Sequence, residues 1–449
     1  MDVKLPTDVL SFMKQIRESG FEVYVVGGAV RNLLLHREVT NWDFTTSATP
    51  EEILALFPDN FYHNTYGTVT VKLADNLFEI TPFRKESNYE DNRHPAQIEW
   101  AKTLEEDLAR RDFTINAMAL RVVSLPQGKL DYEINDLFEG KKHLEEKIIK
   151  TVGDPSKRFQ EDGLRLMRAV RFASQLGFLI DEDTRKAMQE NADRIKNISW
   201  ERIRDELLKI IASDHPAEGI LFLRNTNLLK HILPELDVAF SVPQKSPKRH
   251  HIYDVGTHMV MALAACPSKD PITRFATLLH DIGKVQTFRK DGETGIITFY
   301  NHEVIGMQQA TQIAARLRLS NDQKEKFVRL IQYHQFTVSE IQTDKAVRRF
   351  IREVGKEYLQ DMLDLRTGDR IGSGSTPTSW RLDLFKKRLI EVQKEPFAVK
   401  DLKIDGTDVM KTLNIKPSKQ VGDVLDALFE KVVNGKIKNE REELLKQIT

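Results

Sequence analysis

The chain has 449 residues, 40% of them hydrophobic and 30% charged, which is the composition of an ordinary globular protein and excludes a disordered or fibrous one. Because single hydrophobic cores stop growing at roughly 250 to 300 residues, we expect two or more domains. Lysine plus arginine and aspartate plus glutamate both number 67, which excludes an overall positive field, so any surface for nucleic acid must be a local basic patch.

A single cysteine, Cys266, excludes an internal disulfide and a cysteine-based zinc cluster, and it fits a reducing cytoplasm. It follows the apolar run Met259–Ala265, so we expect it to be a buried small hydrophobic residue. The first residues, Met1–Arg17, are typical of an amphipathic helix and not of a signal peptide. No apolar stretch approaches the roughly 20 residues that cross a bilayer, so we expect a soluble, cytoplasmic protein without a membrane partner.

The first part of the chain alternates strand and helix patterns, which predicts a mixed α/β head. The predicted strands are Phe21–Val26 and Trp42–Thr46, the predicted helices Ala29–His36 and Pro50–Phe57, and the predicted hairpin Gly67–Leu73 with Phe78–Phe83. The polar, charged stretch Lys85–Gln97 is predicted to be a surface loop.

From about Pro155 onwards strand patterns nearly vanish, and a helical period predicts an all-α remainder. Four apolar residues have the spacing of one helix face: Phe159, Leu166, Val170 and Ala173. Two segments rich in loop-forming residues are the predicted linkers or long loops: Ser241–His251 and Gly372–Thr378.

The predicted head contains a candidate phosphate and metal site. Gly27 and Gly28 lie between a strand and a helix, where free backbone amides can hold a triphosphate, although such a pair is also ordinary in a turn. Alternation along the next strand places Asn41 and Asp43 on the same side, and Glu79 lies on a hairpin that can run beside them. Converging carboxylates suit Mg²⁺, and two such ions can activate a hydroxyl and stabilise leaving pyrophosphate.

Five motifs then follow one another in a recognisable order and spacing. They are Gly-Gly-Ala-Val-Arg (27–31), Trp-Asp-Phe-Thr-Thr (42–46), Glu-Ile-Thr-Pro-Phe-Arg (79–84), Glu-Asp-Leu-Ala-Arg-Arg-Asp-Phe-Thr-Ile-Asn-Ala (106–117) and Glu-Asp-Gly-Leu-Arg (161–165). Together they resemble the bacterial-type, or class II, tRNA nucleotidyltransferase and poly(A) polymerase family. The resemblance continues into Asp401–Gly406 and the Asn-Glu-Arg-Glu stretch at 439–442.

The resemblance implies an α+β protein with a small polymerase beta-like head containing a mixed sheet, followed by an all-α neck, body and tail. We place the nucleotidyltransferase head at residues 1–150, the RNA- and base-binding neck at 151–240, a metal-binding helical body at 241–380, and the tail at 381–449.

The resemblance also implies roles for individual residues. Asp43, Glu79 and Asn41 would be catalytic and hold Mg²⁺. The nucleotide would contact Gly27, Gly28, Arg31, Arg111, Asp112 and Asn116. Asp162 and Arg165 would choose the base, and since they are three residues apart we expect them on one face of a helix, where an acceptor and a donor fork can mimic a complementary base edge. The alternative for this pair is an intrahelical ion pair.

Two positions depart from the family pattern. Asn41 replaces the first aspartate of the Asp-x-Asp metal motif, and a neutral amide is expected to weaken Mg²⁺ binding. Three interpretations stay open: a working variant, an inactivating change, or a site in which Asp43 and Glu79 suffice. Asn32 replaces a common aspartate, and we expect its role to concern helix structure.

A second set of residues follows the order of an HD domain, a family whose histidines and aspartates bind divalent metal for phosphate-ester hydrolysis. The set comprises His258, His280, Asp281, His302, His334 and Asp369. Within it, His258, His280, Asp281 and Asp369 are the implied ligands of a second divalent metal, and such a set suits Mn²⁺, Fe²⁺, Co²⁺, Ni²⁺ or Zn²⁺ better than Mg²⁺. The alternative is that these histidines only cap helices or form polar clusters.

The activity implied by the resemblance is template-independent addition of CCA to tRNA 3′ ends from CTP and ATP. Partial addition, poly(A) addition, and a metal-dependent phosphohydrolase with a tRNA-binding but weakened head stay open as alternatives. The expected partners are CTP, ATP and the tRNA acceptor arm, bound through phosphates by basic residues that include Lys196, Arg202, Arg204 and Lys209. The charged segment Glu86–Arg93 is expected either to move between C and A selection or to be a disordered loop.

Overall fold

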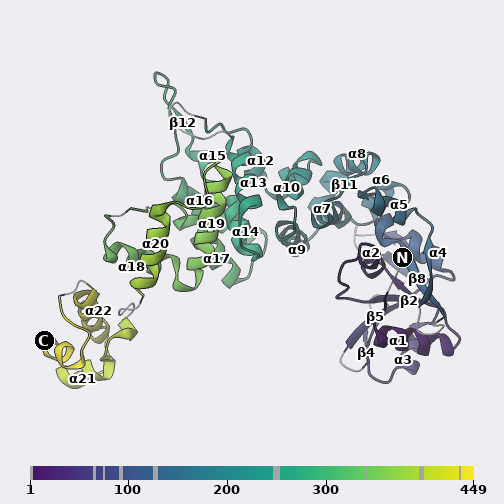
Figure 1. Cartoon of the computed structure of the whole chain (residues 1–449), viewed down its shortest axis with the longest axis horizontal. Coiled ribbons are helices and arrows are strands. Elements are labelled where there is room, and N and C mark those ends of the chain that lie inside the picture. The colour runs from purple at the N-terminus through teal and green to yellow at the C-terminus, as the bar shows by residue number, and fades with distance from the viewer. Residues whose placement is uncertain are drawn as a thin grey trace. The chain divides into compact units, whose positions relative to one another are not determined.

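The computed structural model describes residues 4–63, 67–73, 76–89, 95–124, 130–245, 253–336, 338–339, 341–393, 399–433 and 436–448. The chain forms two compact units, Met1–Asp237 with Arg316–Arg318, and Val238–Ala315 with Leu319–Thr449. Figure 1 shows the mixed head in purple and blue and the helical remainder in teal, green and yellow, which confirms the predicted fold class. Over the described ranges, no helix is long and apolar enough to cross a membrane.

The segment predicted as the head, residues 1–150, is built on a seven-stranded mixed sheet with the strand order β3-β4-β5-β2-β1-β8-β9. Only β2 and β5 pair in parallel, and the other neighbours are antiparallel. The strands are β1 (Val23–Val26), β2 (Asp43–Thr46), β3 (Asn60–His63), β4 (Thr68–Leu73), β5 (Asn76–Pro82), β8 (Met118–Ser124) and β9 (Asp131–Asp136). The predicted first strands and the β4–β5 hairpin are confirmed.

Short helices complete the head: α1 (Thr7–Glu18), α2 (Gly28–Leu34), α3 (Pro50–Leu56), α4 (Leu104–Ala109), the 3₁₀ turn η1 (Thr114–Asn116) and α5 (Gly140–Glu145). Helix α3 begins with a capping box in which the Thr49 and Glu52 side chains each accept the other's backbone N–H. Helix α1 buries its apolar stripe, and the Phe12 ring centroid lies 4.7, 5.0 and 5.0 Å from those of Phe44, Phe57 and Phe78. This aromatic cluster holds α1 to the sheet.

The prediction of a loop over Lys85–Gln97 is wrong in its described parts. Strands β6 (Arg84–Tyr89) and β7 (Pro95–Trp100) form a separate antiparallel pair. Strand β6 has only polar and charged residues before Tyr89, so it lacks the alternation of apolar and polar residues by which strands are recognised. The predicted moving segment Glu86–Arg93 lies partly outside the described residues.

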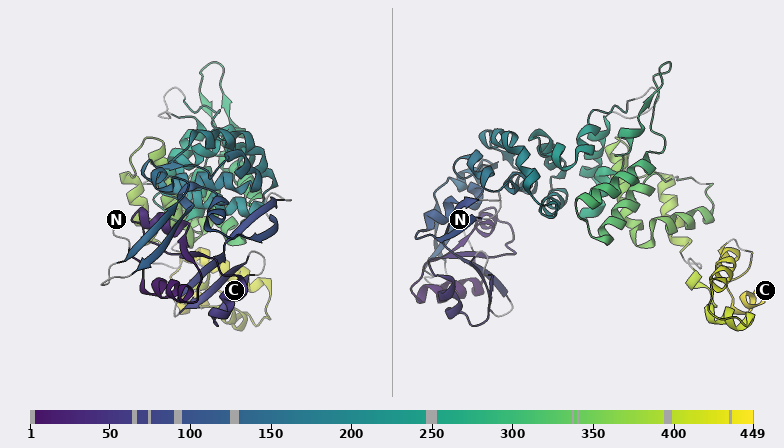
Figure 2. Two further views of the ribbon diagram at one scale, coloured as in Figure 1. Left: turned by 90° about the vertical axis from the view of Figure 1, so that its right-hand side faces the viewer. Right: turned by 180° about the vertical axis from the view of Figure 1, so that it is seen from behind.

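The segment predicted as the neck, residues 151–240, is helical (Figure 2). Within it, α7 packs against α9 and α10. A two-residue parallel pair, β10 (Ile148–Ile149) with β11 (Leu179–Ile180), joins it to the head. The helices are α6 (Pro155–Glu161), α7 (Leu164–Leu176), α8 (Glu182–Asn191), the 3₁₀ segment η3 (Ala192–Asn197), α9 (Trp200–Ile211), α10 (Pro216–Asn225), α11 (Leu229–Ile232) and α12 (Pro234–Ala239). The four residues predicted to share a helix face are all buried, but they belong to two helices, because the chain breaks between α6 and α7.

The second unit is also helical. Its elements are α13 (Val255–Ala265), α14 (Pro271–Leu279), α15 (Lys284–Thr287), the short strands β12 (Arg289–Lys290) and β13 (Ile297–Thr298), α16 (His302–Arg316), α17 (Asn321–Tyr333), α18 (Asp344–Val354), η4 (Lys356–Tyr358), α19 (Leu359–Gly372), α20 (Trp380–Glu391), η5 (Val399–Asp401), α21 (Gly406–Leu413), α22 (Lys419–Val433) and α23 (Arg441–Lys446). Gly372–Thr378 joins α19 to α20 as the predicted loop. Of the other predicted linker, Ser241–His251, residues 246–251 lie outside the described residues.

Two packing features shape this unit. A Cβ atom on Gly368 or Gly372 would lie 2.6 Å from the backbone of Ala262, so both glycines are needed for α19 to lie close against α13. The single cysteine, Cys266, is buried as predicted.

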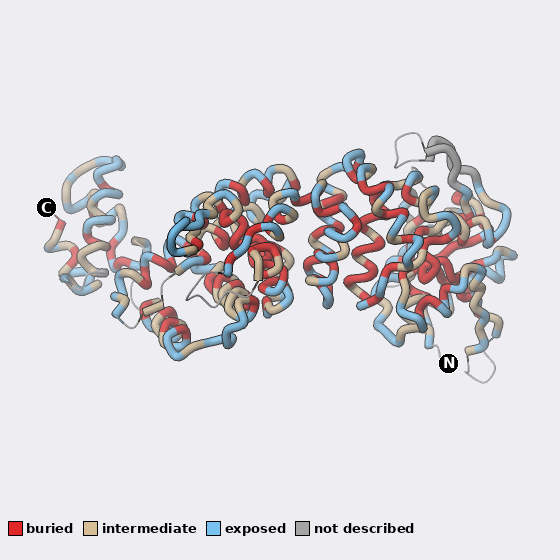
Figure 3. Tube along the Cα trace, turned by 90° about the horizontal axis from the view of Figure 1, so that it is seen from above, coloured by how far each residue is buried: buried red, intermediate tan, exposed pale blue. Residues whose placement is uncertain are grey.

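The last residues have a hydrophobic core of their own, formed by Leu402, Ile404, Val409, Val421, Leu428, Phe429, Leu444 and Ile448. Asn439 ties the two tail motifs together, because its side chain accepts from the Lys403 amide at 2.9 Å and donates to the Asp401 carbonyl at 2.9 Å. In Figure 3 the buried residues, drawn in red, follow the inner faces of the helices and the strands of the sheet.

We predict that Phe12→Ala destabilises the head by about 3–5 kcal/mol, because it removes a fully buried ring from an aromatic cluster. Urea unfolding followed by tryptophan fluorescence and circular dichroism measures the change. The matched control is Phe61→Ala, since Phe61 is 66% exposed and its removal should change the unfolding free energy little. Equal effects of the two substitutions would contradict the assigned role of the cluster.

Candidate functional site

Strands β2 and β5 bring two of the predicted catalytic carboxylates together. Asp43 and Glu79 are direct partners in the parallel register, which confirms that the strand of Glu79 runs beside that of Asp43. Partial burial of its carboxyl group and the charge of Glu79 raise the pKa of Asp43. Two carboxylates that repel each other in this way favour a cation between them.

Asn41 is placed differently from the prediction. It lies two residues before β2, outside the strand, so the alternation that we used to set it beside Asp43 does not apply there. It is exposed, and its amide offers a neutral oxygen in place of a carboxylate.

The turn at Gly27 lies close to Asp43 and Arg111. Gly27 has φ +68° and precedes α2, and a Cβ atom built on it would lie 3.2 Å from Arg111 Nη1 and 3.9 Å from Asp43 Oδ2. The turn, a guanidinium and a carboxylate therefore come within a few ångströms of one another. The positive φ and the close approach together explain why glycine occupies this position.

Arg31 and Asn116 are also brought together as a pair. The Arg31 Nη1 group donates to Asn116 Oδ1 at 2.7 Å, and its Nε and Nη2 groups donate to Asn32 Oδ1 at 3.2 and 3.0 Å. Asn32 thus orients Arg31, a role beyond the helix structure that we expected for it. Burial, followed by repulsion from Arg171, lowers the pKa of Arg31 to about 10.

Asp112 is fully paired inside the protein. Its Oδ2 atom accepts from Arg168 Nε at 2.7 Å, and its Oδ1 atom accepts from the Phe113 amide at 2.9 Å. Burial alone would raise the pKa of Asp112, but Arg168 and these hydrogen bonds outweigh it and hold the pKa at about 2. Arg111 is bound to Asp107 at 3.1 Å. In this structure, therefore, Asp112 positions a neck helix.

An arginine cluster on α7 is a part of the site that the sequence reasoning missed. The guanidinium carbons of Arg31, Arg168 and Arg171 lie 5.2, 5.4 and 4.3 Å from the centre of the Phe172 ring. Arg171 also pairs with the buried Glu206 at 2.7 Å. The signal was present in the sequence, because arginines at 165, 168 and 171 recur every three residues and so follow one side of the helix.

The expected geometry of Asp162 and Arg165 is wrong. Asp162 is not helical, with φ −143° and ψ 110°, and it lies at the break before α7, where its Oδ1 atom accepts from the Leu164 amide at 2.9 Å. Glycine at 163 and this local hydrogen bond favour a break over a continuous helix. The two residues form no intrahelical pair either: Asp162 pairs with Arg202 at 3.0 Å and Arg165 with Glu161.

The four basic neck residues predicted to meet tRNA each lie beside a carboxylate. Besides the Arg202 pair, Lys196 lies 2.6 Å from Asp193, and Lys209 lies 3.4 Å from Glu206. Arg204 lies 2.8 Å from Asp205. The pairs of Lys196 and Arg204 include an exposed aspartate, and such surface pairs are weak, so these two side chains can exchange a carboxylate for a phosphate.

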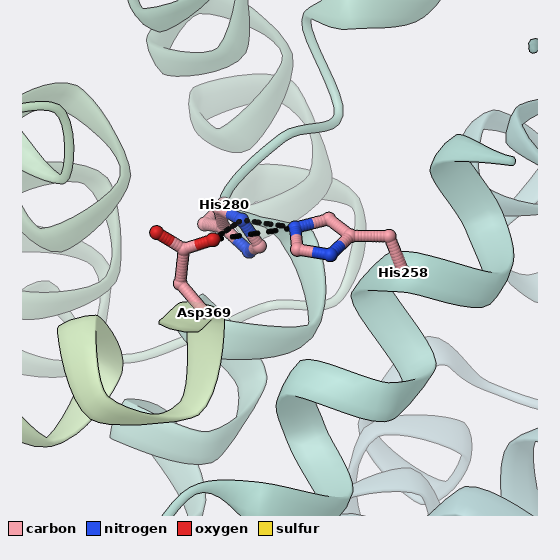
Figure 4. Close-up of side chains that lie close together, drawn as sticks. All are labelled: His258, His280 and Asp369. Atoms are coloured by element: carbon pink, nitrogen blue, oxygen red, sulfur yellow. Dashed lines mark hydrogen bonds and ion pairs between the residues drawn. The ribbon is translucent and has the colours of Figure 1, made fainter. Parts of the chain in front are cut away.

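In the second unit, all six residues that follow the HD order converge. Figure 4 shows His258 on α13, His280 directly after α14, and Asp369 on α19, all pointing toward one another. The His258 Nε2 atom lies 3.2 Å from His280 Nε2 and 3.4 Å from Asp369 Oδ1. His302 and His334, with Nε2 atoms 3.3 Å apart, complete the cluster.

Asp281 lies at the centre of this cluster and is buried, within 3.2 Å of both His258 and His280. Burial alone would lower the pKa of His280, but the carboxylates of Asp281 and Asp369 outweigh it and raise the pKa to about 10. Among the described residues, the two groups of three or more side chains able to hold a metal ion both belong to this cluster.

Three family models match the chain. They describe a poly A polymerase head domain over residues 23–150, a probable RNA and SrmB-binding site of polymerase A over residues 177–240, and a putative tRNA nucleotidyltransferase domain 2 over residues 291–448.

Curated relatives are named CCA-adding enzymes. That of Limosilactobacillus reuteri is 32% identical over 446 residues, which are 97% of this chain and 94% of the relative. That of Lactobacillus helveticus is 44% identical over 233 residues, or 51% of this chain and 56% of the relative.

Solved structures of CCA-adding enzymes have a fold similar to that of this chain. A crystal structure of the Bacillus stearothermophilus CCA-adding enzyme in complex with CTP has a TM-score of 0.70 and 27% identity, covering 98% of this chain and 96% of that one. The Thermotoga maritima CCA-adding enzyme complexed with tRNA has a similar fold, with a TM-score of 0.61 at 21% identity, covering 100% of this chain and 98% of that one.

We predict that Asp112→Asn costs about 2–3 kcal/mol of unfolding free energy at neutral pH, because the partly buried Arg168 would lose its counter-charge. A carboxyl with a lowered folded pKa stabilises the fold above its unfolded pKa near 3.9, and this stability is lost as pH falls toward the folded value of about 2.

Urea unfolding of both proteins at several pH values measures this, and the difference between them should shrink between about pH 5 and pH 2. The matched control is Glu133→Gln, which breaks the exposed pair with Arg121 at 2.9 Å and should cost less than about 1 kcal/mol. A difference that does not change with pH would disprove the role assigned to the Asp112 charge.

Proposed function

The chain belongs to the CCA-adding enzyme family, and from this premise we propose that it is a template-independent tRNA nucleotidyltransferase that adds C, C and A to tRNA 3′ ends. CTP and ATP are the substrates and pyrophosphate is the second product. The observation that carries the proposal is the meeting of the Gly27 turn, Arg111 and Asp43, with Glu79 in register beside Asp43. This arrangement offers backbone amides, a cation and two carboxylates to one nucleoside triphosphate.

The head residues fit a divalent metal, on which this family depends. Asp43 and Glu79 supply carboxylate oxygens, and Asn41 can add an amide oxygen, so we assign Mg²⁺ to this set. When bound, the ion activates the 3′-hydroxyl of the tRNA and stabilises the charge of the leaving pyrophosphate.

We assign binding of the triphosphate to the glycine turn and the arginines around it. The free amides at Gly27 and Gly28 begin helix α2, where a negative group is favoured. Arg31 is oriented by Asn116 and Asn32, so its guanidinium is held in place before the nucleotide arrives. The bound phosphates would relieve the mutual repulsion of Arg31 and Arg171.

We propose that Asp162 and Arg165 choose the base, although not as neighbours on one helix face. Arg202 holds Asp162, while Arg165 donates to the carbonyl oxygens of Arg158 and Arg110 at 3.2 Å each. Each side chain is thus fixed by its own partners at the break before α7. A rigid acceptor and a rigid donor can present a fixed pattern to the edge of cytosine or adenine.

The alternatives differ in what they consume and release. A poly(A) polymerase would use ATP alone on many RNAs, and a partial enzyme would stop after C or add only A. The names of the relatives favour the complete reaction on tRNA. A phosphohydrolase with a weakened head would release phosphate and incorporate no nucleotide.

We predict ordered incorporation of C, C and A into a tRNA lacking its CCA end, measured with labelled CTP and ATP. Asn41→Asp should lower the Mg²⁺ concentration for half-maximal rate by about tenfold, because it adds a negative ligand to the carboxylate pair. The matched control is Asp43→Asn, which removes a charge from the same pair and should lower the rate by about a hundredfold or more.

Three results would contradict parts of the proposal. ATP-only tailing of unrelated RNA would indicate poly(A) polymerase. Activity only in the Asn41→Asp form would mean that the chain as it stands is inactive although its specificity is assigned correctly. Full activity of Asp43→Asn would contradict the assignment of the metal site to this carboxylate pair.

A further inference from the structure

The two side chains that hold Arg31 are both uncharged amides. Its Nε and Nη2 groups donate to Asn32 Oδ1 at 3.2 and 3.0 Å, and its Nη1 group donates to Asn116 Oδ1 at 2.7 Å. Among the residues that the structure describes, no carboxylate forms an ion pair with Arg31. The guanidinium is therefore fixed in direction while its positive charge has no direct counter-charge.

The neighbouring arginines of α7 differ from Arg31 in this respect. Arg168 Nε donates to Asp112 Oδ2 at 2.7 Å, and Arg171 Nε lies 2.7 Å from Glu206 Oε2. The charge of Asp112 raises the pKa of Arg168, whereas burial and repulsion from Arg171 lower the pKa of Arg31 to about 10. Of these three arginines, Arg31 is thus the one whose charge is left for a ligand.

The amide group of Asn32 has one orientation that satisfies its neighbours. Its Oδ1 atom accepts twice from Arg31, so its Nδ2 group is the one that donates to the Glu38 carbonyl oxygen, at 3.3 Å. Its backbone carbonyl accepts from the Arg37 amide at 2.9 Å and closes the end of α2. Asn32 therefore joins Arg31 to residues 36–42, the segment that leads from α2 to β2.

An aspartate at position 32 would have nearly the same shape but a different effect. Its carboxylate would accept from Arg31 and neutralise the guanidinium. Its second oxygen would face the Glu38 carbonyl oxygen, and two acceptors at 3.3 Å repel each other, so the connection to the segment would be lost. The uncharged amide is thus the group that both aims Arg31 and leaves its charge available.

We propose that Asn32 is a positioning residue for the nucleoside triphosphate, because it aims Arg31 at the phosphates without neutralising it. A Cβ atom built on Gly28 would lie 3.5 Å from Arg31 Nη2, so the guanidinium lies beside the glycine turn. A phosphate oxygen at this turn can form a charge-assisted hydrogen bond with Arg31. The inference rests on the proposed function, since it takes CTP and ATP as the ligands.

Incorporation of CTP and ATP into tRNA by the full-length chain tests the role of Asn32. Asn32→Asp should raise the KM for both nucleotides about tenfold and change kcat by less than about twofold, because the charge acts on phosphate binding. Asn32→Ala removes the same hydrogen bonds but adds no charge, so it should raise KM only about threefold. Titration calorimetry with CTP and Mg²⁺ should show the same order of affinities.

The matched control is Asn321→Asp, which adds the same charge at an exposed position at the start of α17 and should leave KM and kcat unchanged. Circular dichroism checks that each variant is folded. An unchanged KM in folded Asn32→Asp, equal KM values for the Asp and Ala variants, or a fall in kcat in place of the rise in KM would overturn the inference.

Calorimetry separates this inference from the proposed function. If the unsubstituted chain binds CTP but incorporates no nucleotide, the proposed function fails, and the CTP affinities of the variants still decide the role of Asn32. If incorporation is normal and the affinities of Asn32→Asp and the unsubstituted chain are equal, only the inference fails. A chain that binds no CTP would overturn both.

Discussion

The ion pair between the buried Asp112 and the partly exposed Arg168 joins the neck helix α7 to the head. Such a pair adds little net stability, because desolvation offsets most of the attraction, but losing one partner leaves the other without its counter-charge and costs about 2–3 kcal/mol. The pair therefore fixes position more than it stabilises the fold. Because α7 begins directly after Asp162 and carries Arg165, this contact also sets the distance between the proposed base-choosing residues and the glycine turn.

Charges of the same sign lie close together at two places in the head and neck. Asp43 and Glu79 repel each other on neighbouring strands, while Arg31 and Arg171 repel each other around Phe172. Glu206 pairs with Arg171 and Arg111 lies near Asp43, so each repulsion is partly offset within the protein. A nucleoside triphosphate with its metal ion supplies further charge of both signs, and relieving the remaining repulsion contributes binding energy.

The sequence predicted those parts of the site that depend on local patterns. The strand–glycine turn–helix order located Gly27, and the hairpin placed Glu79 beside Asp43, because strand pairing follows from hydrophobic alternation and turn residues. It did not predict the break at Asp162, where a side-chain hydrogen bond competes with helix continuation. Nor did it reveal the pairing of Asp112 with a residue 56 positions later, because long-range ion pairs leave no periodic signal. The pair of β6 and β7 was missed because β6 is polar or charged up to Tyr89 and so carries no apolar period.

The carboxylate pair of the head and the histidine cluster of the body offer different ligand atoms to a metal ion. The head offers carboxylate and amide oxygens to an ion whose shell the substrate phosphates complete, so that ion arrives and leaves with the nucleotide. The body cluster offers four imidazoles, three of them held by backbone carbonyls, with the carboxylate of Asp281 close to all four. Such preorganisation favours ions that are retained across many turnovers. Because the head offers oxygen atoms and the body cluster mainly imidazole nitrogens, the two sites favour different divalent ions.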